Sequence, residues 1–301
     1  MKEDDQLERL RRFEIAGHIA FARGRGGLRK LDVTASRSTA EIYLHGAHVT
    51  GFQKNGEPPL LFMSRLSRFE AGQPIRGGIP VCFPWFGPRE GGGTHGFARI
   101  TEWELTETRV TPAGEATLRF RLPPTAAGAA WPPLATELAV TVADRLTLEW
   151  TTTNQSSDRP LAFENCLHSY FAVGDLARIS LTGLQGVPFL DHAAGAGGVP
   201  RDGETAPLRI TKETNRVYLD TPDAVEIRDE SLGRTIRVEK SNSRSTVVWN
   251  PGTTQKMPDD FDPAEHRRMV CVESGNVKQN RLSLAPGETS VLRVTLGSRT
   301  G

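Results

Sequence analysis

The stretch ELAVTVADRLTLEW, residues 137–150, decides the fold class. Apolar side chains alternate with polar ones on both sides of residues 143–145, which predicts two strands joined by a tight turn. Similar alternating or β-branched runs recur at residues 28–34, 38–53, 116–123, 178–184, 224–229, 235–241, 245–250, 269–275 and 290–298. No helix-length segment separates neighbouring runs, which argues against parallel crossovers. The sequence therefore predicts an all-β protein, a large antiparallel β-sandwich.

The N-terminal segment departs from this strand pattern. Leu7, Leu10, Phe13 and Ile15 recur at roughly helical spacing. This spacing predicts a short amphipathic helix, which we expect to cover an open edge of a sheet. We interpret residues 1–20 as a helical extension of the sandwich.

Domain organisation follows from the rest of the chain. We find no internal repeat and no convincing linker, so we interpret residues 1–301 as one domain. The segment 193–207 is rich in glycine, proline and small side chains, which cannot bury an apolar stripe. We expect a mobile loop there.

The overall charge excludes two classes of partner. Lys and Arg together number 37 and Asp and Glu 36, a formal charge of +1, so no long-range field attracts nucleic acid or an anionic membrane. No apolar stretch approaches the ~20 residues of a membrane span, and the start, MKEDDQLERLRRFEIAG, is too charged for a signal peptide. We expect a cytoplasmic, monomeric protein that acts on a small molecule.

The spacing of cysteine and histidine gives no sign of a metal or a disulfide. Cys82, Cys166 and Cys271 form an odd set without a C-x-x-C pair, so we expect reduced, buried thiols. His45 and His48, three apart in an alternating run, should point to opposite faces of a strand. The chain also lacks a G-x-G-x-x-G strand–helix unit and a P-loop, so we expect neither a cofactor nor a metal.

Four segments combine turn residues with polar groups that a packed core would not choose: residues 75–88, 94–99, 163–171 and 247–276. In the first, Arg76 precedes two glycines that allow close backbone approach, and its guanidinium suits an anion. The aromatic faces of Phe83, Trp85 and Phe86 suit the C–H face of a sugar. A tight turn around a local aromatic cluster explains the same residues.

Charged side chains in two other segments allow both a functional and a structural interpretation. His95 and Arg99 lie in THGFAR, where backbone amides and a guanidinium can meet an anionic oxygen. Glu273 lies in the apolar run MVCVES, where an uncompensated carboxylate costs several kcal/mol. Such a residue is either functional or paired, here with Arg267 or Arg268.

The segment FENCLHSYF, residues 163–171, places several polar side chains on one face. Alternation puts Glu164, Cys166, His168 and Tyr170 on the same side of a strand. His168 then either lines a cleft or is a core histidine whose hydrogen bonds are satisfied.

The strings RGGIPVCFPWFGP, HGFAR, LHSYF, VVWNP and MVCVESGNV occur in this order and resemble the hexose-6-phosphate mutarotase branch of the aldose 1-epimerase family. With AEIYLHGAHVTGF, the resemblance covers the chain from about residue 40 to near residue 290. It implies a β-sandwich of the galactose-mutarotase type. It also implies a catalytic pair of one His and one Glu, which fall here on His168 and Glu273.

The same resemblance implies a set of substrate-binding residues. Arg76 of RGGIP and Arg99 of HGFAR are expected to hold the phosphate of the substrate, and His95 to contact a hydroxyl or the ring oxygen. Asp220 corresponds to an acidic site residue after the V-Y-L strand. The sequence departs from the family pattern at Gly252, where an aromatic residue is expected after WNP, so the rim of the site should differ.

We therefore expect a glucose-6-phosphate 1-epimerase that interconverts the α and β anomers of a hexose 6-phosphate. Ring opening needs one proton removed from the C1 hydroxyl and another delivered to the ring oxygen. Glu273 as a carboxylate is the natural base, and His168, able to be protonated near neutrality, the natural acid. Three alternatives are an aldose 1-epimerase of unphosphorylated sugars, a catalytically inactive sugar-phosphate-binding regulatory protein, and an enzyme that uses Cys166 or Cys271.

Overall fold

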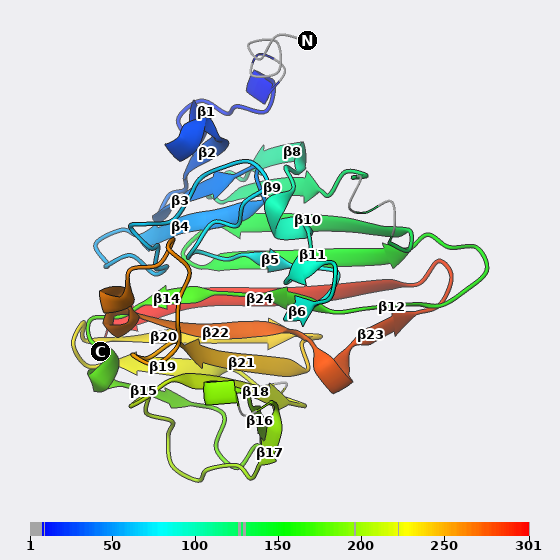
Figure 1. Cartoon of the computed structure of the whole chain (residues 1–301). Helices are drawn as coiled ribbons and strands as arrows, with labels where there is room; N and C mark the ends of the chain where they lie inside the picture. The colour runs from blue at the N-terminus through cyan, green and yellow to red at the C-terminus, as the bar shows by residue number, and fades with distance from the viewer. Residues whose placement is uncertain are drawn as a thin grey trace.

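The computed structural model describes residues 8, 10–125, 128, 131–195, 197–221 and 223–300, and strands make up most of its regular structure (Figure 1). No helix in this part of the chain is long and apolar enough to cross a membrane. Short 3-10 turns connect the strands: η1 (Arg25–Gly27), η2 (Ala98–Ile100), η3 (Leu176–Arg178), η4 (Ala193–Gly195), η5 (Pro263–Arg268) and η6 (Lys278–Asn280).

Two large sheets form the body of the molecule. The larger sheet has the order β15 (Ile179–Thr182), β19 (Val225–Asp229), β20 (Arg234–Ser241), β24 (Thr289–Thr300), β11 (Leu146–Asn154), β10 (Leu134–Val142), β9 (Ala116–Arg121), β8 (Glu104–Val110). The second, which we call the site sheet, has the order β17 (Val199–Arg201), β16 (Phe189–Asp191), β18 (Thr214–Leu219), β21 (Ser245–Asn250), β22 (Met269–Asn276), β13 (Asn165–Leu167), β5 (Val81–Cys82). In addition, β14 (Tyr170–Ala172) pairs with β22.

Three smaller sheets complete the fold. The largest of them has the order β1 (Ile19–Arg23), β2 (Arg29–Thr34), β3 (Ser38–Tyr43), β4 (His48–Lys54). The other two are the pair β6 (Pro88–Arg89) and β7 (Gly93–Thr94), and the pair β12 (Leu161–Phe163) and β23 (Leu282–Leu284).

The hairpin predicted from residues 137–150 is confirmed. β10 and β11 pair antiparallel, with Val142 opposite Leu146 beside the turn. The other predicted runs also form strands, although the run 38–53 divides into β3 and β4, which pair as a hairpin around a turn at residues 44–47. Every pairing between described strands of the two large sheets is antiparallel. β8 was not predicted, because most of its side chains are charged or threonine.

One face of the larger sheet builds the core. Leu138, Val140 and Val142 of β10 are buried, whereas the side chains between them are exposed or half-buried. This is the alternation of an antiparallel strand with one face in water. The buried residues join a hydrophobic cluster that extends from Ile19 to Leu296 and includes side chains of both large sheets, as a β-sandwich requires. The number of domains stays a prediction.

The N-terminal segment lies against the edge of the larger sheet. Leu10 is helical and packs with Phe13 against the core, while Leu7 lies outside the described residues. The hydroxyl of Thr108 in β8 donates to the Phe13 carbonyl at 2.7 Å, so this segment lies beside β8, while its covering of the sheet edge stays a prediction. The extension is shorter than predicted, because β1 begins at Ile19, whose side chain is buried in the core.

The segment predicted to be a loop, residues 193–207, contains a strand of its own. β17 pairs with β16 at the edge of the site sheet, and the short turn η4 precedes it. The mobility of this segment stays a prediction.

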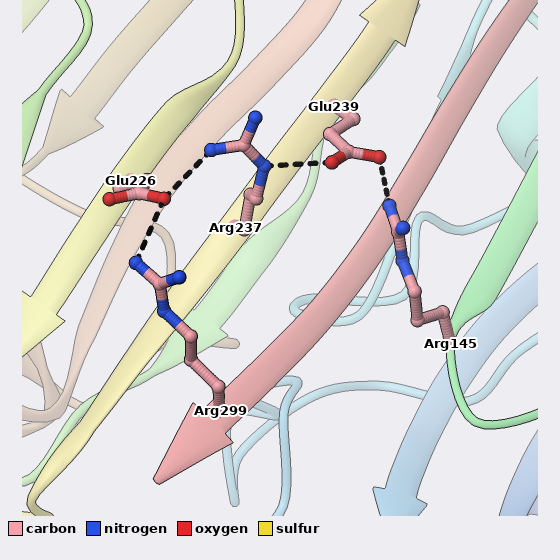
Figure 2. Close-up of polar contacts among 5 residues, drawn as sticks. All are labelled: Arg145, Glu226, Arg237, Glu239 and Arg299. Atoms are coloured by element: carbon pink, nitrogen blue, oxygen red, sulfur yellow. Dashed lines mark hydrogen bonds and ion pairs between the residues drawn. The ribbon is translucent and has the colours of Figure 1, made fainter. Parts of the chain in front are cut away.

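Charged side chains link neighbouring strands of the larger sheet (Figure 2). Glu239 accepts a hydrogen bond from Arg237 Nε at 2.7 Å and also pairs with Arg145. Arg237 Nη1 is 2.8 Å from Glu226 Oε1, which is 3.3 Å from Arg299 Nη2. Exposed pairs of this kind contribute about 0–1 kcal/mol each, so we assign this network to the solvated surface rather than to the stability of the core.

Candidate active site

The register of the site sheet brings His168 and Glu273 together. β13 and β14 pair with β22 in one register, and the residue before His168 lies opposite the residue after Glu273. His168 therefore lies across from Glu273, and its Nε2 is 3.3 Å from Glu273 Oε1. Two residues far apart in the sequence thus form one polar pair.

Burial sets the proton distribution of this pair. His168 is 7% exposed and Glu273 1%. Burial raises the pKa of Glu273 well above its ordinary value, although the Cys166 thiol, 3.7 Å from Oε2, opposes this rise. Burial, followed by the charges of Arg99 and Arg76, lowers the pKa of His168 to about 3. The free cleft therefore favours the proton on Glu273, the reverse of the carboxylate and imidazolium that the sequence suggested.

Aromatic rings fix the orientation of the His168 imidazole. It stacks on Tyr170 with ring centroids 4.8 Å apart and planes at 12°. His95 meets it edge-on at 5.5 Å, and Trp249 does so at 6.1 Å. Trp249 is held in turn by a hydrogen bond from Nε1 to Gln255 Oε1 at 3.0 Å. The ring that would move a proton is thus packed in one orientation.

Glu273 does not form the structural ion pair with Arg267 or Arg268 that the sequence left open as an alternative. Its side chain meets His168 and Cys166, whereas Arg267 and Arg268 are exposed on η5.

The thiols beside the pair are also unsuited to nucleophilic chemistry. Burial raises the pKa values of Cys166 and Cys271 well above the ordinary range of a thiol, so neither is a thiolate near neutrality. This argues against a cysteine enzyme.

The two glycines of RGGIP position Arg76. A Cβ on Gly78, whose φ is +59°, would lie 2.3 Å from the Val49 carbonyl oxygen, so only glycine fits there. The turn places Arg76 in the same cleft as the acid–base pair. Its Nε and Nη2 donate to the carboxylate of buried Asp260 at 3.3 and 3.2 Å, so part of its charge is already matched.

Arg99 lacks such a partner. Its Nη2 donates to the Thr94 carbonyl at 2.7 Å, but within the described parts of the chain its Nε is buried without a hydrogen bond and no carboxylate is within ion-pair distance. Burial lowers the pKa of its guanidinium. An unmatched buried cation is costly, so its position favours an anionic ligand.

His95 lies on a strained turn at the rim of the cleft. Its φ is +64°, and its Nδ1 accepts a hydrogen bond from Gly87 N at 3.2 Å. The ring also packs against Phe86 with centroids 4.6 Å apart. Burial lowers the pKa of His95 well below its ordinary value, so the ring is neutral and can exchange hydrogen bonds with a hydroxyl.

These residues line a single cleft of about 460 Å³, a size usual for small-molecule sites. Five of the six predicted site residues border it: Arg76, His95, Arg99, His168 and Glu273. A larger, mostly apolar hollow of about 740 Å³ lies beside Trp131, but none of the predicted site residues lines it.

Asp220 is the predicted site residue that the structure places elsewhere. Its carboxylate is 65% exposed and pairs with Arg244, and it does not line the cleft. It is therefore left out of the site proposed below. The departure at Gly252 has a local cause, because its φ is +56° and a Cβ there would lie 2.5 Å from Glu213 N. An aromatic side chain would not fit this turn.

Sequence reasoning missed several residues of the cleft. Lys278, Lys256 and His192 border it, and Asp260 supports Arg76. Lys256 and Asp260 lie in a connection without periodicity, and His192 lies just before the predicted loop. For Lys278, a cation two residues after ESGN was the available signal.

Among the described residues, one group of side chains could offer ligand atoms to a metal ion. Ligand atoms of His168, Cys271 and Glu273 lie within 4.8 Å of one another. A thiol must lose its proton to bind a metal, and burial raises the pKa of Cys271. The group thus suits proton exchange better than metal binding. His45 and His48 each bind a different backbone carbonyl, and His45 lies in the turn of residues 44–47 between β3 and β4 rather than in a continuous strand with His48.

Comparisons with known proteins give a consistent result. Residues 29–297 match the model of the aldose 1-epimerase family. Two relatives, both provisionally named glucose-6-phosphate 1-epimerase, come from Escherichia coli K12 and Cenchrus ciliaris. The first is 36% identical over 80% of this chain and 81% of its own, and the second 32% identical over 90% and 85%.

Solved structures share the fold. A Salmonella typhimurium protein, provisionally described as a mutarotase, has a TM-score of 0.86 and 26% identity over 98% of this chain and all of its own. A Synechocystis protein has a TM-score of 0.74 with 20% identity over 94% of this chain and 99% of its own, a likeness of fold alone.

Proposed function

This chain belongs to the aldose 1-epimerase family, and on that premise we propose that it is a glucose-6-phosphate 1-epimerase, which interconverts the anomers of a hexose 6-phosphate. The observation that carries the proposal is the juxtaposition of a buried acid–base pair, His168 and Glu273, with the unmatched guanidinium of Arg99 in one cleft. The pair suits ring opening, and the cation suits a phosphate. A neutral sugar gives no reason to bury Arg99.

In the proposed reaction, Glu273 removes the proton of the C1 hydroxyl while His168 delivers one to the ring oxygen. The C1–O5 bond breaks, its electrons go to O5, and an open-chain aldehyde forms. The pair then consists of a protonated Glu273 and a neutral His168, the state that burial favours. Rotation about C1–C2 and the reverse transfers close the ring on the other face.

The phosphate of the substrate has two roles in this proposal. It anchors the sugar through charge-assisted hydrogen bonds to Arg99 and Arg76. It also offsets the two positive charges that help to lower the pKa of His168, which moves the pair toward the imidazolium and carboxylate needed before ring opening. The phosphate itself stays unbroken.

The central test is exchange NMR of anomer interconversion, with glucose 6-phosphate and glucose measured side by side at equal enzyme concentration. We expect kcat/KM for the phosphorylated sugar to exceed that for glucose at least tenfold, because a hydrogen bond to a charged group is worth about 1.5–3 kcal/mol.

Each alternative has its own outcome in this experiment. Equal rates on both sugars would indicate an epimerase of free sugars. Binding of glucose 6-phosphate without exchange would indicate a regulatory protein.

Metal removal gives a second check. After exhaustive treatment with EDTA and gel filtration, we expect the exchange rate to change less than twofold, because the proposed proton transfers need only side chains. Loss of activity that a divalent cation restores would instead assign a metal to His168, Cys271 and Glu273. Enzyme passed through the same column without EDTA is the control.

A further inference from the structure

A phosphate bound in the cleft would need a second positive charge besides that of Arg99. Asp260 offsets the charge of Arg76, and the His168–Glu273 pair carries no net charge whichever of the two holds the proton. A phosphate monoester carries close to two negative charges near neutrality. Arg99 supplies one unmatched positive charge, so a dianion bound there needs a second cation, for which the cleft offers two lysines, Lys256 and Lys278.

Lys278 has the position and chemistry to supply the missing charge. It borders the cleft, and a Cβ added to Gly87 would lie 3.5 Å from its Nζ, so the ammonium lies beside the turn that carries His95. In the described part of the molecule no carboxylate is within ion-pair distance of this ammonium. Among the described residues, an acid contacts Lys278 only through its backbone N–H.

That acid is Glu164, which links the two walls of the cleft. Its Oε1 accepts from Lys278 N at 2.6 Å, and its Oε2 accepts from Phe86 N at 2.8 Å. Beyond Phe86, Gly87 N donates to His95 Nδ1 at 3.2 Å. One carboxylate thus fixes both the turn of Lys278 and the turn that orients His95.

The backbone conformation of Lys278 is one that surrounding contacts must hold in place. Its φ is +57°, in the left-handed region that non-glycine residues seldom adopt. Such conformations persist only where surrounding contacts hold them, and they concentrate at functional sites. Here Lys278 N donates to Glu164 Oε1 at 2.6 Å, and the Lys278 carbonyl accepts from Arg281 N at 3.1 Å.

We propose that Lys278 is a further phosphate-binding residue, which with Arg99 matches a dianion, and that Glu164 is the positioning residue that holds it there. This inference rests on the proposed function. It names a specificity determinant outside the sequence motifs that suggested the site.

The test compares Lys278→Met, which keeps most of the aliphatic stem but removes the charge, with Lys278→Arg, which retains the charge. We expect Lys278→Met to raise KM for glucose 6-phosphate about tenfold or more, with kcat changed less than threefold. Kinetics with glucose should change less than twofold, and Lys278→Arg should restore at least half of the lost affinity. Arg281→Gln is the matched control, since this exposed cation of the same turn does not line the cleft.

Glu164→Gln separates positioning from binding. An amide can accept from only one of the two backbone N–H groups without placing its own NH₂ against the other. We expect KM for glucose 6-phosphate to rise as in Lys278→Met, and kcat to fall as well, because the turn of His95 loses its support. An unchanged kcat and KM would overturn the role given to Glu164.

Inorganic phosphate provides a readout independent of turnover. Its dissociation constant, measured by calorimetry, should rise about tenfold in Lys278→Met and stay unchanged in Arg281→Gln. Equal losses on both sugars, or unchanged phosphate affinity, would overturn the assignment of Lys278. If the wild-type protein fails to exchange glucose 6-phosphate, the proposed function fails, while the phosphate titration still decides the role of Lys278.

Discussion

Glu273→Gln is expected to lower the catalysed rate of anomer exchange at least 100-fold. Glutamine has nearly the same shape but cannot exchange a proton, and a general acid–base group contributes about 10²–10⁴-fold. Thermal unfolding should not be impaired, because burial already favours the uncharged form of Glu273, which the amide resembles. Exchange NMR measures the rate, and Glu70→Gln, the same change at an exposed position, is the control.

His168→Asn extends this prediction to the pair. If the two side chains act as one unit, each single variant should lose at least 100-fold, and the double variant little more than the worse single variant. Cys166→Ala and Cys271→Ala should each lose less than tenfold. A loss under tenfold in both Glu273→Gln and His168→Asn would refute the assignment, and a larger loss in a cysteine variant than in either would restore the cysteine alternative.

Period-two alternation predicted the strands of the larger sheet because that sheet has one buried face, whereas β21 and β22 of the site sheet are buried at every position. The hairpin of β10 and β11 follows from this local rule, since its partners are neighbours in the sequence. The contact between His168 and Glu273 does not, because it depends on the register of β13 and β14 against the distant β22. Resemblance to a family supplied those two residues, and the structure shows how the register joins them.

The residues whose position relative to the cleft alternation could not predict lie where the backbone leaves regular strands. Asp220 and Lys278 have φ values of +55° and +57°, and alternation says nothing about where a side chain points in such turns. Asp220 follows β18 but turns outward to Arg244, whereas Lys278 follows β22 and borders the cleft. Proton placement was also beyond the sequence, because it depends on the burial of Glu273.

Of the two arginines in the cleft, Arg99 is the better probe of the phosphate. Arg76 holds Asp260, so its removal would leave a buried carboxylate without a partner and disturb the rim. Among the described residues, the Arg99 side chain donates one hydrogen bond, to the Thr94 carbonyl. Its loss therefore removes an unmatched charge at little structural cost.

Arg99→Met is expected to raise KM for glucose 6-phosphate about 10- to 100-fold, since one hydrogen bond to a charged group is worth about 1.5–3 kcal/mol. With glucose the rate should stay the same or rise slightly, because Arg99 also helps to lower the pKa of His168, and removing that charge favours the protonated imidazole. Exchange NMR on both sugars separates these effects, and Arg99→Lys, which keeps the charge, should recover part of the affinity. Equal losses with both sugars would mean that Arg99 shapes the cleft and does not bind the phosphate.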